Sequence, residues 1–319
     1  MKLKSMKTIW SLLGPFIGLL LVLLIFAIAA PSAFRSLYNL KTIVTQTVII
    51  GTGALGMTLV IISGGIDLSV GSVIALTTVG IANVLNAGSS PWMSVLAVIA
   101  ALLIGFLCGM VNGVLSASLR IVPFIVTLGT MQIARGMAKW LAHEQAVLAP
   151  ETWLNGLMNV DPEPAWLLFA PGVWIMIALS AIIIFVLRKT VFGRYVFALG
   201  SNEQTARLCG IPVAKTRILI YSLGGLFAGI SGIMQFANLT VGDPTAASGS
   251  ELDIIAAVVI GGGSLNGGEG SALGSIVGAL MMAVLRNGCN LVGIPNYVQN
   301  IVIGTIIIGA VAADRLKRS

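Results

Sequence analysis

The sequence predicts an all-α polytopic membrane protein of about ten transmembrane helices, with both termini in the cytoplasm. Three observations support this prediction. The 319 residues include only 18 basic and 11 acidic ones, so 9% of the chain is charged, against about 25% in a typical soluble domain. Hydrophobic residues make up 57% of the chain, and the mean hydropathy is +1.02. The few charges are also spaced so that long uncharged windows remain, enough for helices of about 20 residues.

This composition excludes several classes of protein. A soluble enzyme, a disordered chain or a soluble nucleic-acid binder needs more charged surface than this chain has, despite its net charge of +7. The lipid bilayer is therefore an expected partner, and nucleic acid is not. The three cysteines form no CxxC pair, and the single His143 removes the usual route to a histidine-built metal site. We expect no metal ion.

The uncharged windows predict the spans of the first half in order. Residues 68–119 are long enough for two helices, with a break at Gly88-Ser-Ser-Pro91. The window that begins at 121 reaches Trp140 if Arg135 and Lys139 snorkel towards the interface. The first window is too long for a signal-peptide core, so we read it as a retained helix. These windows are 8–34, 42–66, 68–119 and 121–134.

The second half supplies five further windows, which brings the count to ten spans. Two of them are short, and the charges at Glu269 and Arg286 delimit them. The windows are 164–187, 218–242, 254–268, 270–285 and 287–313.

Basic residues set the orientation, because cytoplasmic loops of membrane proteins are enriched in Lys and Arg. Lysines precede the first span, six basic residues lie in 188–217, and three more end the chain. These segments are predicted to be cytoplasmic. The outer loops keep few basic residues, namely Arg35, Lys41 and Arg286.

Acidic residues gather in two predicted outer loops, 141–164 and 238–253. Such a rim is either an ordinary solvated surface or a docking surface for an extracytoplasmic partner of complementary charge. The residues are Glu144, Glu151, Asp161, Glu163, Asp243, Glu251 and Asp253.

A glycine-rich stretch at Gly261–Gly270 resembles a phosphate loop but lacks its chemistry. It has no Gly-Lys-Ser/Thr ending with which to reach the terminal phosphates and magnesium, and it lies between two apolar spans. The chain is therefore not expected to hydrolyse ATP or to be an enzyme by itself.

Residues 63–72, Ser-Gly-Gly-Ile-Asp-Leu-Ser-Val-Gly-Ser, interrupt an otherwise continuous helix. A backbone freed inside a membrane must be buried in protein or face a water-filled cavity. Asp67 is either a functional carboxylate or the N-cap of a helix that starts near Leu68, accepting from the amide of Ser69 or Val70. We favour the cap.

Two glycine ladders repeat the GxxxG spacing that lets membrane helices approach closely. A single GxxxG adds Gly225 and Gly229. Packing within the chain is favoured over a dimerisation face, and the same helices could border a gate. The ladders are Gly105, Gly109 and Gly113, and Gly270, Gly274 and Gly278.

The predicted cytoplasmic loop 188–217 contains a short bracketed helix over 203–209. Asn202 is a suitable N-cap, Glu203 places a negative charge in the first turn, and Gly210 followed by Pro212 is a natural stop. The helix either lies on lipid or inserts into a cytoplasmic partner. Because so short a helix anchors weakly in lipid, we favour insertion into a partner.

Several ordered motifs resemble the permease subunits of ribose-type bacterial ABC sugar importers, from about residue 35 to the C-terminus. Each motif alone would be weak evidence, but their shared order makes the resemblance specific. They are Ser63-Gly-Gly-Ile-Asp-Leu-Ser-Val-Gly71, Gly193-Arg-Tyr-Val-Phe-Ala-Leu-Gly-Ser-Asn-Glu203, Ala206-Arg-Leu-Cys-Gly-Ile211, Glu251-Leu-Asp-Ile-Ile-Ala-Ala-Val-Val-Ile-Gly-Gly262 and Arg286-Asn-Gly-Cys-Asn-Leu-Val-Gly293.

The resemblance implies a single transmembrane permease domain over 1–319, similar in fold to the cobalamin-type (type II) importers. It implies a homodimer in the bacterial cytoplasmic (inner) membrane, a cytoplasmic ABC ATPase that binds ATP and Mg, and a periplasmic sugar-binding protein. No cofactor is expected in this chain. Residues 202–210 match the coupling helix that docks on the ATPase. The contact residues expected there are Asn202, Glu203, Ala206, Arg207 and Gly210.

The candidate pathway and gate residues lie in the two glycine-containing breaks. The chain departs from the family where Gly263 replaces a small hydroxyl residue and Glu269 a basic one, which puts subunit contact there in doubt. The candidates are Gly64, Gly65, Asp67, Ser69, Gly261 and Gly262.

The implied function is alternating-access import of a monosaccharide, ribose or a related sugar. Two alternatives remain: an ABC permease for another small solute, such as a nucleoside or amino acid, and an ion-coupled secondary transporter. The secondary transporter needs a buried carboxylate or histidine relay, for which Asp67 is the one respectable candidate.

Overall fold

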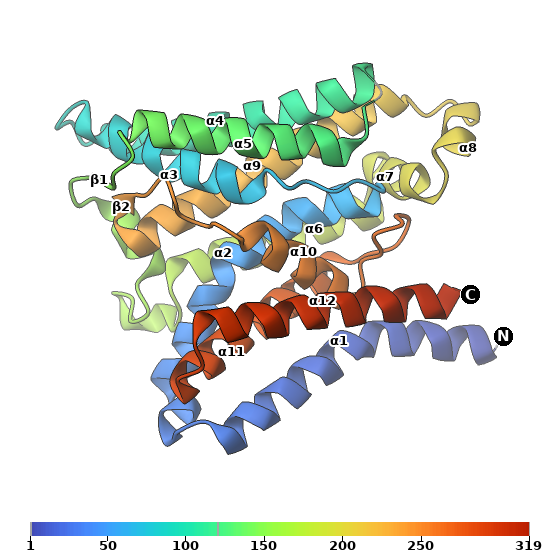
Figure 1. The fold of residues 1–319 in the computed structure, drawn as a ribbon, viewed down its shortest axis with the longest axis horizontal. Coiled ribbons are helices and arrows are strands. Elements are labelled where there is room, and N and C mark those ends of the chain that lie inside the picture. The colour runs from blue at the N-terminus through green and yellow to red at the C-terminus, as the bar shows by residue number, and fades with distance from the viewer. Residues whose placement is uncertain (1, 120, 319) are drawn as a thin grey trace.

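The computed structural model describes residues 2–119 and 121–318, and these are mostly helical (Figure 1). The break predicted after residue 87 separates the third helix from the fourth. The helices of the first half are α1 (Lys2–Ala29), α2 (Leu37–Ile62), α3 (Val70–Asn86), α4 (Met93–Ser118) and α5 (Pro123–Leu141), with a 3₁₀ turn η1 (Ser32–Arg35).

The second half begins with two 3₁₀ turns and contains two short helices between longer ones. The turns are η2 (Trp153–Met158) and η3 (Ala165–Leu167). The helices are α6 (Pro171–Lys189), α7 (Val191–Ser201), α8 (Glu203–Leu208), α9 (Val213–Leu239), α10 (Ser250–Ile260), α11 (Ala272–Val292) and α12 (Asn296–Arg318).

Five helical stretches within the described residues are long and apolar enough to cross a membrane by themselves. Four of them are α2, α4, α9 and α11, and the fifth joins η3 to α6. Shorter apolar helices lie at 14–29, in α3 and at 296–309. These helices establish a polytopic membrane protein. The count of ten spans remains a prediction. At the two termini the structure describes the backbone of the basic residues but not their side chains.

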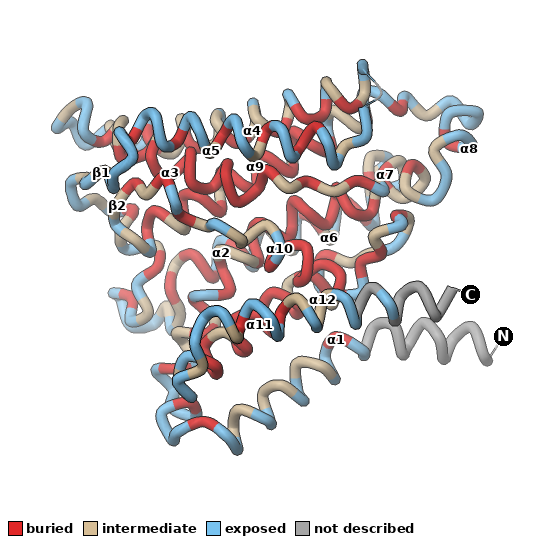
Figure 2. The backbone as a smooth tube through the Cα atoms, in the orientation of Figure 1, coloured by how far each residue is buried: buried red, intermediate tan, exposed pale blue. Residues whose placement is uncertain are grey.

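The bundle has inner and outer helices, which Figure 2 shows by burial. In the most apolar stretches of α2 and α11, 83% and 78% of the residues are buried, against 28% in α4 and 33% in the stretch that includes α6. The inner helices are thus surrounded by protein, while α4 and α6 present apolar side chains outward, as lipid contact requires.

Helix α4 separates large from small residues on its two faces. Large exposed residues at Leu96, Ile99, Leu103 and Leu107 repeat at helical spacing, whereas the opposite face carries buried alanines and glycines. That small-residue face packs against α9. The outward face is therefore suited to lipid and the inward face to close backbone contact.

The first glycine ladder makes this contact within the chain. A Cβ at Gly105 would collide with the backbone of Gly225, one at Gly109 with the carbonyl of Tyr221, and one at Gly113 with the backbone of Ile218. The GxxxG of α9 thus faces the ladder of α4.

The second ladder does not lie on one helix. Gly274 and Gly278 are in α11 and approach the backbones of Gly261 and Ala257 in and after α10, but Gly270 precedes the helix and faces Ile62. The expectation of a three-residue helical ladder there is wrong, because Ser271 caps α11 by accepting from Gly274 and so starts the helix after Gly270.

The prediction of Arg286 as an outer-loop residue is also wrong. Helix α11 continues past it to Val292 and ends at Gly293, whose φ is +80°. The Arg286 guanidinium donates to the Asp253 carboxylate of α10 at 2.5 Å, and the Asp253 side chain is 6% exposed. Because the two charges neutralise each other, a charge can lie inside a helix that charge spacing alone would end.

Candidate functional site

The predicted coupling segment is a short helix at one end of the molecule. In Figure 1, α8 lies at the same end as the marks for both chain termini, opposite β1 and β2 (Val147–Leu148 and Val241–Gly242). Asn202 caps α8, since its Oδ1 accepts from the amide of Thr205 at 2.8 Å. The helix ends at Leu208, and Gly210 follows with a φ of +80°. Both local signals in the sequence therefore act as predicted.

Glu203 joins α8 to two arginines. Its Oε1 accepts from Arg207 within α8 at 3.1 Å, and its Oε2 accepts from Arg217 of α9 at 2.6 Å. The Arg217 side chain is 19% exposed, whereas that of Arg207 is 61% exposed. The bond to Arg217 therefore ties the short helix to a long inner one. Sequence reasoning missed Arg217, because a separation of fourteen residues carries no helical periodicity.

The exposed side of α8 contains an apolar residue that the sequence analysis also missed. Leu208 is 88% exposed, while Ala206 is buried and anchors the helix. Beside α8 lies a hollow of about 340 Å³, lined by residues that include Ser116, Pro123 and Arg207. Arg207 and Leu208 are thus exposed next to each other in α8, beside this hollow.

The chain before α8 packs against two distant segments at glycine residues. We call this cluster the glycine junction, and it consists of Gly64, Gly200, Gly267 and Gly268. A Cβ at Gly200 would collide with the carbonyl of Ile62 and the amide of Gly268. That amide donates to the same carbonyl at 2.8 Å. The end of α2, the end of α7 and the glycine-rich loop before α11 are thus held together at the backbone.

Asp67 lies in a buried polar network. Its Oδ1 accepts from the amide of Ser69 at 2.8 Å and from its hydroxyl at 2.6 Å, and Asn112 of α4 donates to that hydroxyl at 3.0 Å. Helix α3 begins at Val70, so the predicted start near Leu68 is two residues too early. The carboxylate caps the turn that precedes the helix, not the helix itself.

The remaining gate candidates lie in two places. Gly65 contacts the Tyr221 hydroxyl, near Asp67, whereas Gly261 lies against the Gly274 carbonyl and Gly262 has a φ of +92°. The second place borders a hollow of about 340 Å³. The glycine junction links the chain segments of the two groups through the hydrogen bond from the Gly268 amide to the Ile62 carbonyl.

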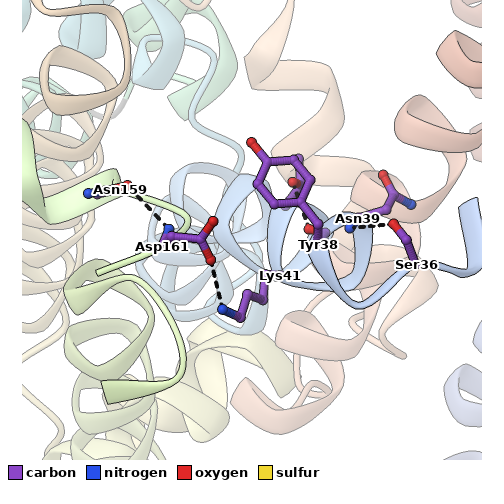
Figure 3. A network of polar contacts seen from close by, with 7 residues as sticks. Ser36, Tyr38, Asn39, Lys41, Asn159 and Asp161 are labelled. Atoms are coloured by element: carbon purple, nitrogen blue, oxygen red, sulfur yellow. Dashed lines mark hydrogen bonds and ion pairs between the residues drawn. The ribbon is translucent and has the colours of Figure 1, made fainter. Parts of the chain in front are cut away.

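At the other end of the molecule, the antiparallel pairing of β1 with β2 brings the two predicted outer loops together. Figure 3 shows Lys41 donating to Asp161, at 2.8 Å. Asp253 is buried in its pair with Arg286. The acidic rim is therefore smaller than the sequence suggested. Its exposed members in these loops include Glu144, Glu151 and Glu163.

Comparison with known proteins gives one family and many relatives. Residues 39–311 match the family described as branched-chain amino acid transport system / permease component. The chain is 38% identical over 313 residues to the ribose import permease protein RbsC of Bacillus subtilis, which covers 96% of this chain and 93% of the relative.

Two relatives from Escherichia coli K12 match the chain over a similar length. The ribose import permease protein RbsC is 40% identical over 310 residues, covering 95% of this chain and 93% of the relative. The L-arabinose transport system permease protein AraH is 37% identical over 314 residues, covering 98% and 93%. No solved structure matches the chain.

Proposed function

This chain belongs to the family of branched-chain amino acid transport system permease components, and from that premise we propose that it forms the translocation path of an ATP-driven ABC importer for a monosaccharide. The resemblance to sugar ABC permeases, which the sequence motifs predicted, is confirmed by relatives at 37–40% identity over nearly the whole chain.

The proposed substrate is ribose or a related sugar. The family description names amino acids, but the relatives reported above are named for ribose and L-arabinose. A nucleoside or amino acid is the alternative within the same class. An ion-coupled secondary transporter is disfavoured, because the Asp67 carboxylate already accepts two hydrogen bonds from Ser69.

One observation carries the mechanism: α8 projects an exposed Leu208 and is tied to α9 through Glu203 and Arg217. We propose that α8 is the coupling helix and that it docks in a cytoplasmic ABC ATPase, which binds the ATP and Mg. Of the predicted contact residues, Asn202 and Gly210 shape the helix, Glu203 ties it to α9, Ala206 anchors it, and Arg207 lies exposed beside Leu208.

Movement of α8 has two routes into the membrane part. The first is the Glu203 to Arg217 pair, which leads to α9 and its glycine contact with α4. The second is the glycine junction, which leads to the breaks at residues 63–69 and 261–268. Backbone contacts transmit displacement directly, because no flexible side chain lies between them. Alternating access then follows from movement of these two breaks.

The assembled importer is proposed to contain two copies of this chain, with ten spans each, a type II fold and cytoplasmic termini, in the bacterial inner membrane. The loaded sugar-binding protein would dock at the opposite end from α8. The exposed carboxylates there suit a partner with basic residues at its contact surface.

The function is tested by reconstituting the chain with its ATPase in proteoliposomes and adding different binding proteins. We expect a loaded monosaccharide-binding protein to stimulate ATP hydrolysis and drive sugar uptake. Stimulation only by an amino-acid-binding or nucleoside-binding protein would replace the sugar assignment, and uptake that continues without any ATPase would favour the secondary transporter.

A further inference from the structure

A polar stripe runs along one face of α5. Gln132, Arg135 and Lys139 follow at spacings of three and four residues, while Ile133 and Met137 of the same helix are exposed apolar residues. Arg135 is six residues from the end of α5 at Leu141, or about 9 Å along the axis. Charged groups at that depth face water or protein, because contact with lipid is costly.

Backbone carbonyls of a neighbouring segment hold the Arg135 side chain. Its Nη1 donates to the carbonyls of Pro244 at 3.0 Å and Ala246 at 2.8 Å, both in the segment between β2 and α10. The segment therefore covers part of the stripe and borders an open cavity of about 270 Å³. The polar lining residues are Ser72, Gln132, Arg135, Lys139, Thr245, Ser248 and Glu251.

Arg135 has two acidic neighbours, Glu251 in the cavity wall and Asp243, which does not line the cavity. Within the described residues no ion pair of 4.0 Å or less joins Arg135 to either of them. The Glu251 Oε2 atom is buried and has no hydrogen-bond partner in the described part of the chain. A buried carboxylate oxygen without a partner is costly, so a ligand that donates to it would be stabilised.

A neighbouring cavity shows the contrasting case. Ser248 also lines a second hollow, of about 420 Å³, whose lining includes Asp253 and Arg286. There the acid and base are paired with each other at 2.5 Å. There the charges neutralise each other, whereas Arg135 and Glu251 line the same cavity without an ion pair between them in the described residues, and the Glu251 Oε2 atom makes no hydrogen bond there.

We propose that the cavity formed by Ser72, Gln132, Arg135 and Glu251 is a transit site for a small, neutral, polyhydroxylated molecule within the outer half of the membrane part. A hydroxyl group both donates and accepts, so it can bridge an arginine and a carboxylate that do not meet. The volume lies near the lower end for ligand pockets, about 300 Å³, which suits a monosaccharide. The proposal rests on the proposed function and extends it to a binding site in this chain.

The test uses the complex of this chain with its ATPase in lipid nanodiscs, without binding protein. Saturation-transfer NMR reports contact with D-ribose, L-arabinose or D-ribonate, an anion of similar skeleton. Gln132→Leu is the primary variant, because Gln132 is exposed and no hydrogen bond from its side chain is found in the described residues. Gln145→Leu, an exposed outer-loop glutamine, is its matched control.

We expect at least one of the two neutral sugars to bind. Its apparent dissociation constant should rise about fivefold in Gln132→Leu and more than about tenfold in Glu251→Leu, because the latter removes a charged acceptor. Glu251→Gln should lie between wild type and Glu251→Leu, and Gln145→Leu should match wild type. This ordering is not expected if Glu251 only holds α10 in place.

Absence of contact with both neutral sugars, a preference for D-ribonate, or equal binding by wild type and Gln132→Leu would each overturn the transit site. ATP-driven uptake by the complete importer is measured separately and bears only on the proposed function. If the complete importer takes up sugar but the nanodisc complex binds none, the importer assignment stands and the proposed transit site is wrong.

Discussion

The carboxylate of Glu203 and the guanidinium of Arg217 lie 2.6 Å apart and join the exposed helix α8 to the inner helix α9. The same carboxylate contacts Arg207, but that side chain is 61% exposed and belongs to α8 itself. Of the two pairs, the one with Arg217 spans two elements, so it is the one able to carry movement between them.

Arg217→Gln is therefore expected to weaken coupling more than Arg207→Gln does. In proteoliposomes with ATPase and loaded binding protein, we predict that sugar transported per ATP falls about tenfold in Arg217→Gln, since a charge-assisted bond between elements is lost. Arg207→Gln is the matched control. If both variants transport the same amount of sugar per ATP, the ion pair between Glu203 and Arg217 does not transmit movement from α8 to α9.

Gly210 has a φ of +80°, a conformation that costs other residues about 1–2 kcal/mol, although no atom lies within 4 Å of a Cβ placed there. Gly210→Val should shift the end of α8 and lower sugar uptake while ATP hydrolysis continues. Gly210→Asn should be milder, because asparagine tolerates this conformation. Normal sugar accumulation by Gly210→Val in vesicles would contradict the coupling role.

The contact between α4 and α9 should be sensitive to a single methyl group. A Cβ at Gly109 would meet the Tyr221 carbonyl, so Gly109→Ala is expected to destabilise the chain by about 1–3 kcal/mol. Gly129→Ala in α5, where nothing lies within 4 Å, is the control and should leave stability unchanged or raise it by roughly 0.5–1 kcal/mol. Unfolding in detergent measures both, and a similar change in the two would argue against close backbone packing.

Removing one member of the buried Asp253 and Arg286 pair should lower the free energy of unfolding more than neutralising both members does. Arg286→Gln leaves a carboxylate that is 6% exposed without its partner, which should cost about 3 kcal/mol of unfolding free energy. The double variant Asp253→Asn with Arg286→Gln should recover part of that loss. Additive effects of the two single variants would mean that the residues do not interact.

The orientation of the chain in the membrane can be tested by labelling a natural cysteine. Cys209 follows α8 and is exposed, whereas Cys289 is buried and Cys108 is partly buried. A membrane-impermeant maleimide should label Cys209 in inside-out vesicles and not in right-side-out cells. A variant with Cys209→Ser and Ser90→Cys, which moves the exposed cysteine to the connection between α3 and α4, should show the reverse pattern. Labelling of Cys209 from outside would invert the proposed topology.

The features that the sequence predicted well depend on neighbouring residues. The cap at Asn202 and the left-handed Gly210 bracket α8 because each acts on amides or dihedrals within a turn of chain. The break between α3 and α4 follows in the same way from a run of glycine, serine and proline. The start of α3 was misplaced by two residues because Asp67 bonds to Ser69 and closes a turn before the helix.

Two further predictions failed, one because of a partner that lies far away in the chain and one because of a helix cap that the glycine spacing does not show. Charge spacing placed Arg286 in a loop, since it treats each charge as exposed, but Asp253 from another helix neutralises it. Gly270 shares the ladder spacing with Gly274 and Gly278, yet the cap at Ser271 excludes it from their helix. Spacing along the chain reports neither an opposing charge nor where a helix starts.

The sequence by itself determined that this is a helical membrane protein, where several of its helices break, and that α8 is a capped helix in a basic loop. Composition and short-range backbone chemistry suffice for these. Only the tertiary structure decided that Arg217 holds Glu203, that α4 faces α9 through glycine, and that Arg135 and Glu251 border one cavity without meeting. These relationships involve residues from 14 to more than 100 positions apart, and no periodicity in the sequence records them.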